Sequence, residues 1–192
     1  MANDVVVTGK KVLLRRKRLD DAPLDYEWRT DPELAALDAS RPIRLSYREY
    51  LRYHRDELEF PTPWSRKFAI ETRGKKFIGN CMCYDINTVA SEAEVGILLG
   101  DKDYWGKGYG TEALNLLVGH IFKATSINRL YLHTLSWNSR AQQSFAKCGF
   151  QELRAVMRSG MEFYLMELMR DDWIGDGISH DNEQVFPMIN PT

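Results

Sequence analysis

The chain has 192 residues, of which 44% are apolar and 28% charged, and its formal net charge is −1. This composition is typical of one soluble globular domain, and the near-neutral charge predicts no general affinity for nucleic acid. No run approaches the ~20 apolar residues of a membrane span, and no apolar segment resembling a signal peptide begins the chain. We therefore expect no membrane contact and a cytoplasmic location.

Cysteine and histidine content points to neither a disulfide framework nor a metal site. The three cysteines, Cys81, Cys83 and Cys148, are odd in number and lack framework spacing. The four histidines have no spacing that is typical of metal ligands, so we expect no metal. We interpret the cysteines as buried thiols in a reducing compartment.

The N-terminal segment, residues 1–9, is expected to be loose apart from the valine run at 5–7. Val12 and Leu14 then alternate with other residues and predict a first strand, which ends in a basic run at 15–18. We interpret the basic run as the solvated end of this strand, because four cations make too small a face for nucleic acid.

Three helices are predicted between residues 19 and 60. Each start carries polar residues that suit the free N–H groups of a first helical turn. These residues are Asp20 or Asp21, then Asp31 followed by Pro32, then Ser46 with Glu49 in a capping box. In the third helix Tyr50 and His54 belong to a stripe at helical spacing, which we interpret as packing rather than substrate contact.

Three strands follow, and the short turns between them predict antiparallel neighbours. Their ranges are 67–72, 76–87 and 92–99. In the second strand, Phe77, Cys81 and Cys83 are expected to share one face of the sheet.

The second half of the chain alternates helices and strands. A helix over 110–123 has an apolar face, made of Leu114, Leu117, Val118 and Ile121. A strand over 129–135 follows, then a helix that begins at Asn138 and ends near Gly149, then a hairpin over 151–157 and 161–169. The order predicts an α/β fold with a mixed sheet, in a single domain at 1–175 followed by a tail at 176–192.

Three glycines, Gly106, Gly108 and Gly110, lie between the strand at 92–99 and the next helix. Glycine lets the backbone approach a phosphate closely, and a helix N-terminus attracts anions through its unpaired N–H groups and its dipole. We interpret this segment as a phosphate cradle. It is not a P-loop, because Gly108 stands where Ser or Thr is required. It is not a dinucleotide fingerprint either, because Thr111 stands where Gly or Ala is required.

The segment Trp-Gly-Lys-Gly-Tyr-Gly-Thr-Glu-Ala at 105–113, preceded by Ala-Glu-Val-Gly-Ile, resembles the acetyl-CoA site of the GNAT family of N-acetyltransferases. Trp105, Gly108 and Gly110 occupy the positions of the family pattern. Trp105 replaces the usual Gln or Arg, as is common in the branch similar to ribosomal-protein N-terminal acetyltransferases (RimJ/RimL-like). The resemblance covers nearly the whole chain. It implies a mostly antiparallel GNAT-like sheet whose central strand pair splays apart, with the pantetheine arm in the gap.

The same resemblance implies a set of residues that contact acetyl-CoA. These are Leu98, Leu99, Trp105, Gly106, Lys107, Gly108, Tyr109, Gly110, Thr111 and Asn138. Asn138 is also expected to cap its own helix. Arg140 and Lys147 could meet the nucleotide end of the cofactor, but we favour solvated helix charges for both.

Glu94 is the candidate catalytic base, because a Glu at the matching position removes the amine proton in some family members. Glu71, Asp85 and Glu92 are the alternatives. No general acid is assigned: Phe145 stands where the family often has Tyr, and the branch's Ser is replaced by Ala141. The facing of Tyr131 and Tyr164, on nearby strands, is left open.

The predicted function is acetyl-CoA-dependent transfer of an acetyl group to a primary amine, on a protein or peptide N-terminus or a small molecule. Polyamine or aminoglycoside acetylation is an alternative acceptor choice. A non-catalytic acyl-CoA sensor is a second hypothesis, motivated by the missing Tyr and Ser. A dimer is left open.

Overall fold

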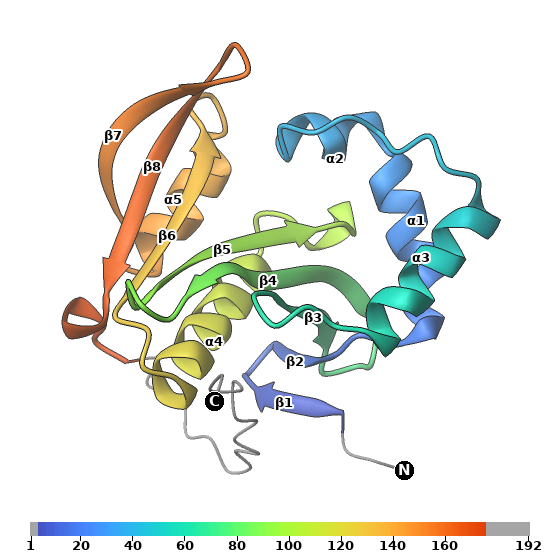
Figure 1. The fold of residues 1–192 in the computed structure, drawn as a ribbon, viewed down its shortest axis with the longest axis horizontal. Helices are drawn as coiled ribbons and strands as arrows, with labels where there is room; N and C mark the ends of the chain where they lie inside the picture. Colours follow the sequence, from blue (N-terminus) through green and yellow to red (C-terminus); the bar gives the residue numbers. More distant parts are fainter. Residues whose placement is uncertain (1–3, 176–192) are drawn as a thin grey trace.

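The computed structural model describes residues 4–175, which build an eight-stranded sheet with helices on both faces (Figure 1). The strand order is β1-β2-β3-β4-β5-β6-β8-β7, and each neighbouring pair is antiparallel except β5 with β6. The strands are β1 Val5–Thr8, β2 Val12–Arg16, β3 Arg66–Thr72, β4 Phe77–Asn87, β5 Glu92–Leu99, β6 Arg129–Leu135, β7 Gln151–Arg158 and β8 Met161–Met169. The mostly antiparallel α/β sheet is therefore confirmed.

The helices begin where the capping residues predict. They are α1 Ala22–Thr30, α2 Pro32–Leu37, α3 Tyr47–Glu59, α4 Tyr109–Ala124 and α5 Ser139–Lys147, with short 3-10 segments η1 Leu19–Asp21, η2 Lys102–Tyr104 and η3 Arg170–Asp172. The Asp31 side chain accepts from two N–H groups of α2, and Ser46 forms the expected capping box with Glu49. Within residues 4–175, no helix is both long and apolar enough to cross a membrane.

Two details at the start of the chain differ from expectation. The valine run, which was excepted from the loose segment, forms the edge strand β1 together with Thr8, and Val6 and Val7 bury their side chains as β1 pairs with β2. Asp21 does not cap α1 with its side chain. Its carboxylate instead accepts two hydrogen bonds from the Arg15 guanidinium.

The basic run at the end of β2 is a solvated strand end only in part: Arg16 and Arg18 are exposed, but Arg15 and Lys17 are not. Arg15 is only 2% exposed and bonds both Asp21 and Glu71. Lys17 contacts Asp25 and donates to Asn80. These buried ion pairs tie β2 to η1, α1, β3 and β4.

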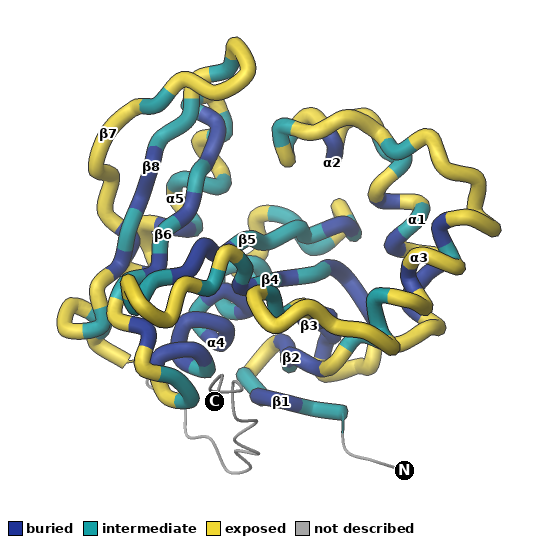
Figure 2. Tube along the Cα trace, in the orientation of Figure 1, coloured by how far each residue is buried: buried dark blue, intermediate teal, exposed yellow. Residues whose placement is uncertain are grey.

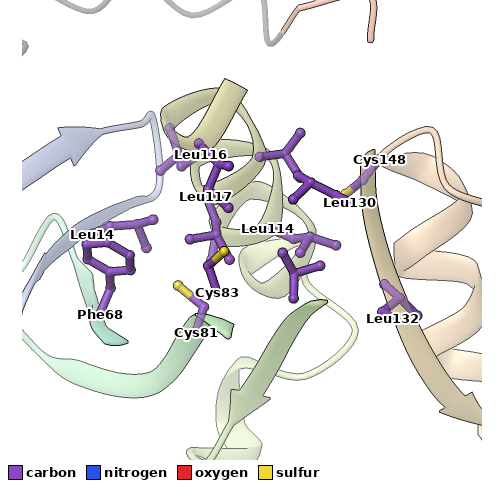
Figure 3. Packing of buried hydrophobic residues seen from close by; sticks show 14 of the residues in the cluster. Leu14, Phe68, Cys81, Cys83, Leu114, Leu116, Leu117, Leu130, Leu132 and Cys148 are labelled. Atoms are coloured by element: carbon purple, nitrogen blue, oxygen red, sulfur yellow. The ribbon is translucent and has the colours of Figure 1, made fainter. Parts of the chain in front are cut away.

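The main core lies between α4 and the sheet (Figure 3). All four residues of the predicted apolar face of α4 are buried, as are Cys81 and Cys83. Phe77 does not share their face: it packs with Trp28 of α1 in a second cluster on the opposite side. The register of β3 with β4 shifts between Ile70 and Glu71, and this irregularity changes the side to which Phe77 points. Figure 2 shows that burial concentrates around α4 and β4, whereas β7 is exposed.

The centre of the sheet is forked. β5 and β6 pair only where Glu92–Glu94 lies beside residues 129–131. Beyond Glu94 and Tyr131 the strands diverge, so that β5 continues along β4 while β6 continues along β8 (Figure 1). This is the splayed pair that the sequence resemblance implies. The predicted tail at 176–192 lies outside the described residues.

Candidate functional site

The loop before α4 brings bare backbone N–H groups to a surface. Gly106 and Gly108 have φ of 70° and 83°, a left-handed conformation that glycine adopts without strain. Gly108 is the N-cap of α4, and no side chain caps the helix there. The N–H groups of the first turn therefore remain available to an anion, and the helix dipole favours negative charge at this end.

A cavity of 270 Å³ opens at this helix end, between β5 and α5. Eight of the ten residues predicted to contact acetyl-CoA line it, namely Leu98, Leu99, Trp105, Gly106, Gly108, Gly110, Thr111 and Asn138. The Asn138 side chain accepts from the N–H of Ala141, which confirms its capping role and leaves its amide NH₂ for other partners.

Lys107 and Tyr109 do not line this cavity. The Lys107 carbonyl accepts a hydrogen bond of 2.8 Å from Lys11 Nζ, and the Tyr109 ring packs against Tyr104 at the edge of the core. Lys11, in the turn between β1 and β2, thus supports the loop from outside. Sequence reasoning did not find it, because it lies 96 residues away along the chain.

The far wall of the cavity comes from α5, and here the sequence reasoning missed residues. Arg140 and Lys147, which we expected to be solvated helix charges, both line the cavity. The Arg140 guanidinium lies 3.7 Å from the centre of the Trp105 ring and so joins α5 to the glycine loop. Ser144 also lines the cavity and shares a 2.8 Å hydrogen bond with Thr111.

Glu94 lies at the base of the fork, outside the cavity lining. Its Oε1 is 2.8 Å from His133 Nδ1, and the two side chains are only 9% and 8% exposed. Tyr84 faces Glu94 across the β4–β5 pairing. Burial, followed by the negative charge of Glu94, raises the pKa of the Tyr84 hydroxyl, so Tyr84 stays neutral. The His133 partner was not found from the sequence.

The alternative bases are otherwise engaged or exposed. Glu71 is held by Arg15, and Glu92 forms an ion pair with Arg129. Asp85 is exposed near the end of β4. Among the four candidate bases, Glu94 is therefore the one that is buried at the fork and paired with a histidine.

Phe145, at the family's general-acid position, is a core residue, and the two tyrosines on nearby strands differ in their surroundings. Phe145 is buried and packs near Phe150, with ring centres 6.3 Å apart. Tyr131 lies at the fork, where its ring meets that of His133 edge-on. Tyr164 lies against the main core instead.

A larger cavity, of 710 Å³, lies between α3, β3 and the end of α4. Three cations at its wall already have partners: Lys17 contacts Asp25, Lys67 contacts Glu57, and Arg66 donates to backbone carbonyls. It contains no bare helix start, so we do not assign the anion site there. Among the described residues, no cluster of His, Cys, Asp and Glu is arranged to hold a metal ion.

Comparisons with known proteins agree with this geometry. A family model described as an acetyltransferase (GNAT) domain matches residues 11–151. The uncharacterized N-acetyltransferase p20 of Bacillus licheniformis is 23% identical over 173 residues, 86% of this chain and 97% of that protein.

Two solved structures show a similar fold. The spermidine N-acetyltransferase from Vibrio cholerae, in complex with CoA and spermine, has a TM-score of 0.77 and 19% identity, covering 85% of this chain and 98% of that chain. An aminoglycoside acetyltransferase in complex with coenzyme A has a TM-score of 0.70 and 17% identity, covering 84% and 96%.

Proposed function

Because the chain belongs to the GNAT family of acetyltransferases, we propose that it moves an acetyl group from acetyl-CoA to a primary amine in the cytoplasm. The observation that carries this proposal is the uncapped start of α4, which opens on the 270 Å³ cavity between the end of β5 and α5. A diphosphate suits bare N–H groups at a helix N-terminus. The three cysteines are free thiols, which suits a reducing compartment.

Several side chains would complete the acetyl-CoA site. Arg140 and Lys147 add positive charge on the α5 wall, where phosphates need counter-charges. The Asn138 amide can donate to a carbonyl of the pantetheine arm, because only its oxygen is engaged in the cap. The bound thioester supplies the activated acyl group, and the protein binds it, aligns it and removes a proton from the amine.

We assign the removal of that proton to Glu94, acting directly or through a group bonded to it. An alkyl amine has a pKa near ~10 and arrives mostly protonated, so a base at the fork is required. Glu94 stands where β5, whose far end lines the cavity, forms its last pair with β6. Its side chain is buried, and its carboxylate contacts the imidazole of His133.

The charges at the fork favour a cationic small molecule as the acceptor. Besides Glu94, three carboxylates contribute negative potential at Tyr84 or Tyr131: Asp38, Asp85 and Glu92. The nearby cation Arg129 is shared between Glu92 and Glu167. A polyamine or an aminoglycoside would satisfy this excess of negative charge. A protein N-terminus, suggested by the RimJ/RimL-like sequence segment, is the second acceptor that we propose.

The test of the cofactor site is Gly110→Val. A Cβ on Gly110 would meet only Ile97 Cδ1, at 3.9 Å, and both residues line the cavity. Valine should therefore fold normally, because Val is a better helix former than Gly, yet occupy space that the ligand needs. We expect the Kd for CoA, measured by calorimetry, to rise at least about tenfold, or roughly 1.4 kcal/mol. Gly108→Val is less informative, because the φ of 83° at Gly108 strains any side chain.

The matched control is Gly74→Val, in the turn between β3 and β4. A Cβ there would lie 3.6 Å from the nearest atom, Thr72 Oγ1, which is an ordinary contact. It should leave CoA affinity unchanged. Saturating CoA should also raise the melting temperature of the wild type, since a hundredfold excess over Kd stabilises by about 2.7 kcal/mol. No binding of CoA by the wild type would refute the cofactor site. Binding without thiol release for any amine would support the acyl-CoA sensor instead.

A further inference from the structure

The pairing of Glu94 with His133 assigns the proton transfer to a specific atom. We infer that the base is Nε2 of His133, and that Glu94 is a positioning residue that orients the imidazole and stabilises it when protonated. This inference rests on the proposed function and identifies the atom that carries out its proton transfer.

The position of His133 in the fork is the first support. The last pair between β5 and β6 joins Glu94 to Tyr131, and His133 follows two residues later on the same face of β6. The cavity lining begins further along the same two branches, at Ile97 after Glu94 and at Asn138 after His133. The imidazole therefore stands just beyond the last β5–β6 pair, at the closed end of the fork and outside the cavity lining itself.

The hydrogen bond decides which nitrogen is basic. An ionised carboxylate can only accept, so the 2.8 Å contact with Glu94 places the proton of the neutral ring on Nδ1. Nε2 then carries the lone pair. Among residues 4–175 we find no hydrogen-bond partner for Nε2, although the side chain is only 8% exposed. A buried acceptor without a protein partner is suited to a ligand proton.

The same ring resolves the missing general acid. Nε2 first accepts a proton from the ammonium group, and the freed lone pair then forms the C–N bond while the carbonyl π electrons move to oxygen. The second proton on the nitrogen is lost to solvent as the amide forms. The C–S bond then breaks with its electron pair on sulfur, and the imidazolium gives that proton to the thiolate. Glu94 stays ionised throughout and stabilises the imidazolium, as carboxylates do in other carboxylate–histidine pairs. His133 thus serves first as the base and then as the acid, so the reaction needs no separate general acid at the position of Phe145.

The titratable and charged groups at the fork come from several neighbouring elements. Glu94 contacts the His133 ring directly, and Tyr131 meets it edge-on. Further out, Asp38, Asp85 and Glu92 act on Tyr84 or Tyr131, and Arg129 is paired with Glu92 and Glu167. The carboxylate in direct contact favours a positive ring during the reaction.

The kinetic test is His133→Asn, measured as kcat/KM against pH with acetyl-CoA and spermine. The Asn amide nitrogen lies near the place of Nδ1 and can still donate to Glu94, but nothing replaces Nε2. We expect a loss of about 10²–10⁴-fold and disappearance of the acidic limb of the pH profile. In Glu94→Gln the limb should persist and move to lower pH, because the imidazolium loses its counter-charge. His120→Asn, on α4 away from the fork, is the control and should keep the wild-type rate.

A second measurement does not depend on activity. NMR of protein labelled with ¹⁵N-histidine can be recorded in the absence of substrates. The His133 signal is the one that is missing from the spectrum of His133→Asn, and it should show the Nδ1–H tautomer. An Nε2–H tautomer, or a His133→Asn rate within about threefold of wild type, would overturn the inference, since a base contributes far more. If wild type transfers acetyl to spermine, an aminoglycoside and a peptide N-terminus at no measurable rate, the proposed function fails instead.

Discussion

Two groups of buried carboxylates differ in their partners: Asp21 with Glu71 beneath η1, and Glu94 at the fork. Beneath η1, Asp21 and Glu71 both bond Arg15, whose guanidinium is permanently charged. At the fork, Glu94 bonds His133, whose neutral imidazole has one nitrogen that donates and one that accepts. Residues of similar type and similar burial therefore have partners of different chemistry.

The difference distinguishes a structural role from a chemical one. The guanidinium of Arg15 donates at Nε to Glu71 and at Nη1 and Nη2 to Asp21, so the pair is closed to ligands. The imidazole of His133 contacts Glu94 through Nδ1, and within residues 4–175 its Nε2 has no hydrogen-bond partner. We expect changes beneath η1 to affect stability and changes at the fork to affect rate.

The largest expected effect on stability comes from Arg15→Leu. The variant leaves Asp21 and Glu71 buried without their cation, and loss of one member of a buried pair costs about 3–5 kcal/mol. Urea unfolding should show this loss, while kcat per folded molecule stays near the wild-type value. Lys102→Leu removes an exposed cation that pairs with Asp31 and Glu33, and should lower the stability far less. Equal losses in the two variants would remove the distinction between buried and exposed pairs.

A smaller effect should appear in acid. Burial opposes ionisation of Asp21, but the hydrogen bonds from Arg15 and from the backbone of Arg18 outweigh it, so the pKa of Asp21 is lowered. A lowered pKa contributes stability above the unfolded value, near ~3.9, and that stability is lost as pH falls through the folded pKa. Asp21→Asn should be less stable than wild type at pH 7.

The two variants should then converge as the pH falls. The free energy of unfolding of wild type should decline more steeply below pH ~4 than that of Asp21→Asn, because only the wild type has this carboxylate to protonate. Urea unfolding at a series of pH values measures the difference. Parallel curves would show that the pairing of Asp21 does not depend on its charge.

The parts of the site that the sequence predicts are those with local patterns. The glycine loop, the start of α4 and the cap at Asn138 each depend on residues within a few positions of one another. For that reason eight of the residues that line the cavity could be predicted. The splayed sheet followed from the resemblance and not from spacing, because divergence of two strands leaves no local signature.

The remainder depends on pairing between distant segments. His133 and Glu94 are 39 residues apart, and Arg15 and Glu71 are 56 apart, so no periodicity connects them. The misplaced facing of Phe77 has a similar cause, since the irregularity in the β3–β4 register becomes visible only when both strands are present. A lone His on an alternating strand gives no sign of its carboxylate partner.

The smallest expected effect is that of Tyr84→Phe, which refines the account of the fork. Tyr84 faces Glu94, and burial together with the charge of Glu94 raises its pKa, so the hydroxyl stays protonated and offers a hydrogen to the carboxylate. That hydroxyl competes with His133 for the negative charge of Glu94. Removing it should strengthen the interaction of Glu94 with the protonated imidazole. The acidic limb of kcat/KM should therefore move to higher pH by less than about one unit, since a neutral donor contributes roughly 1 kcal/mol. The free energy of unfolding should change little compared with Arg15→Leu, because Phe keeps the ring and its packing. A shift of the limb to lower pH would show that Tyr84 supports the positive ring rather than competing with it.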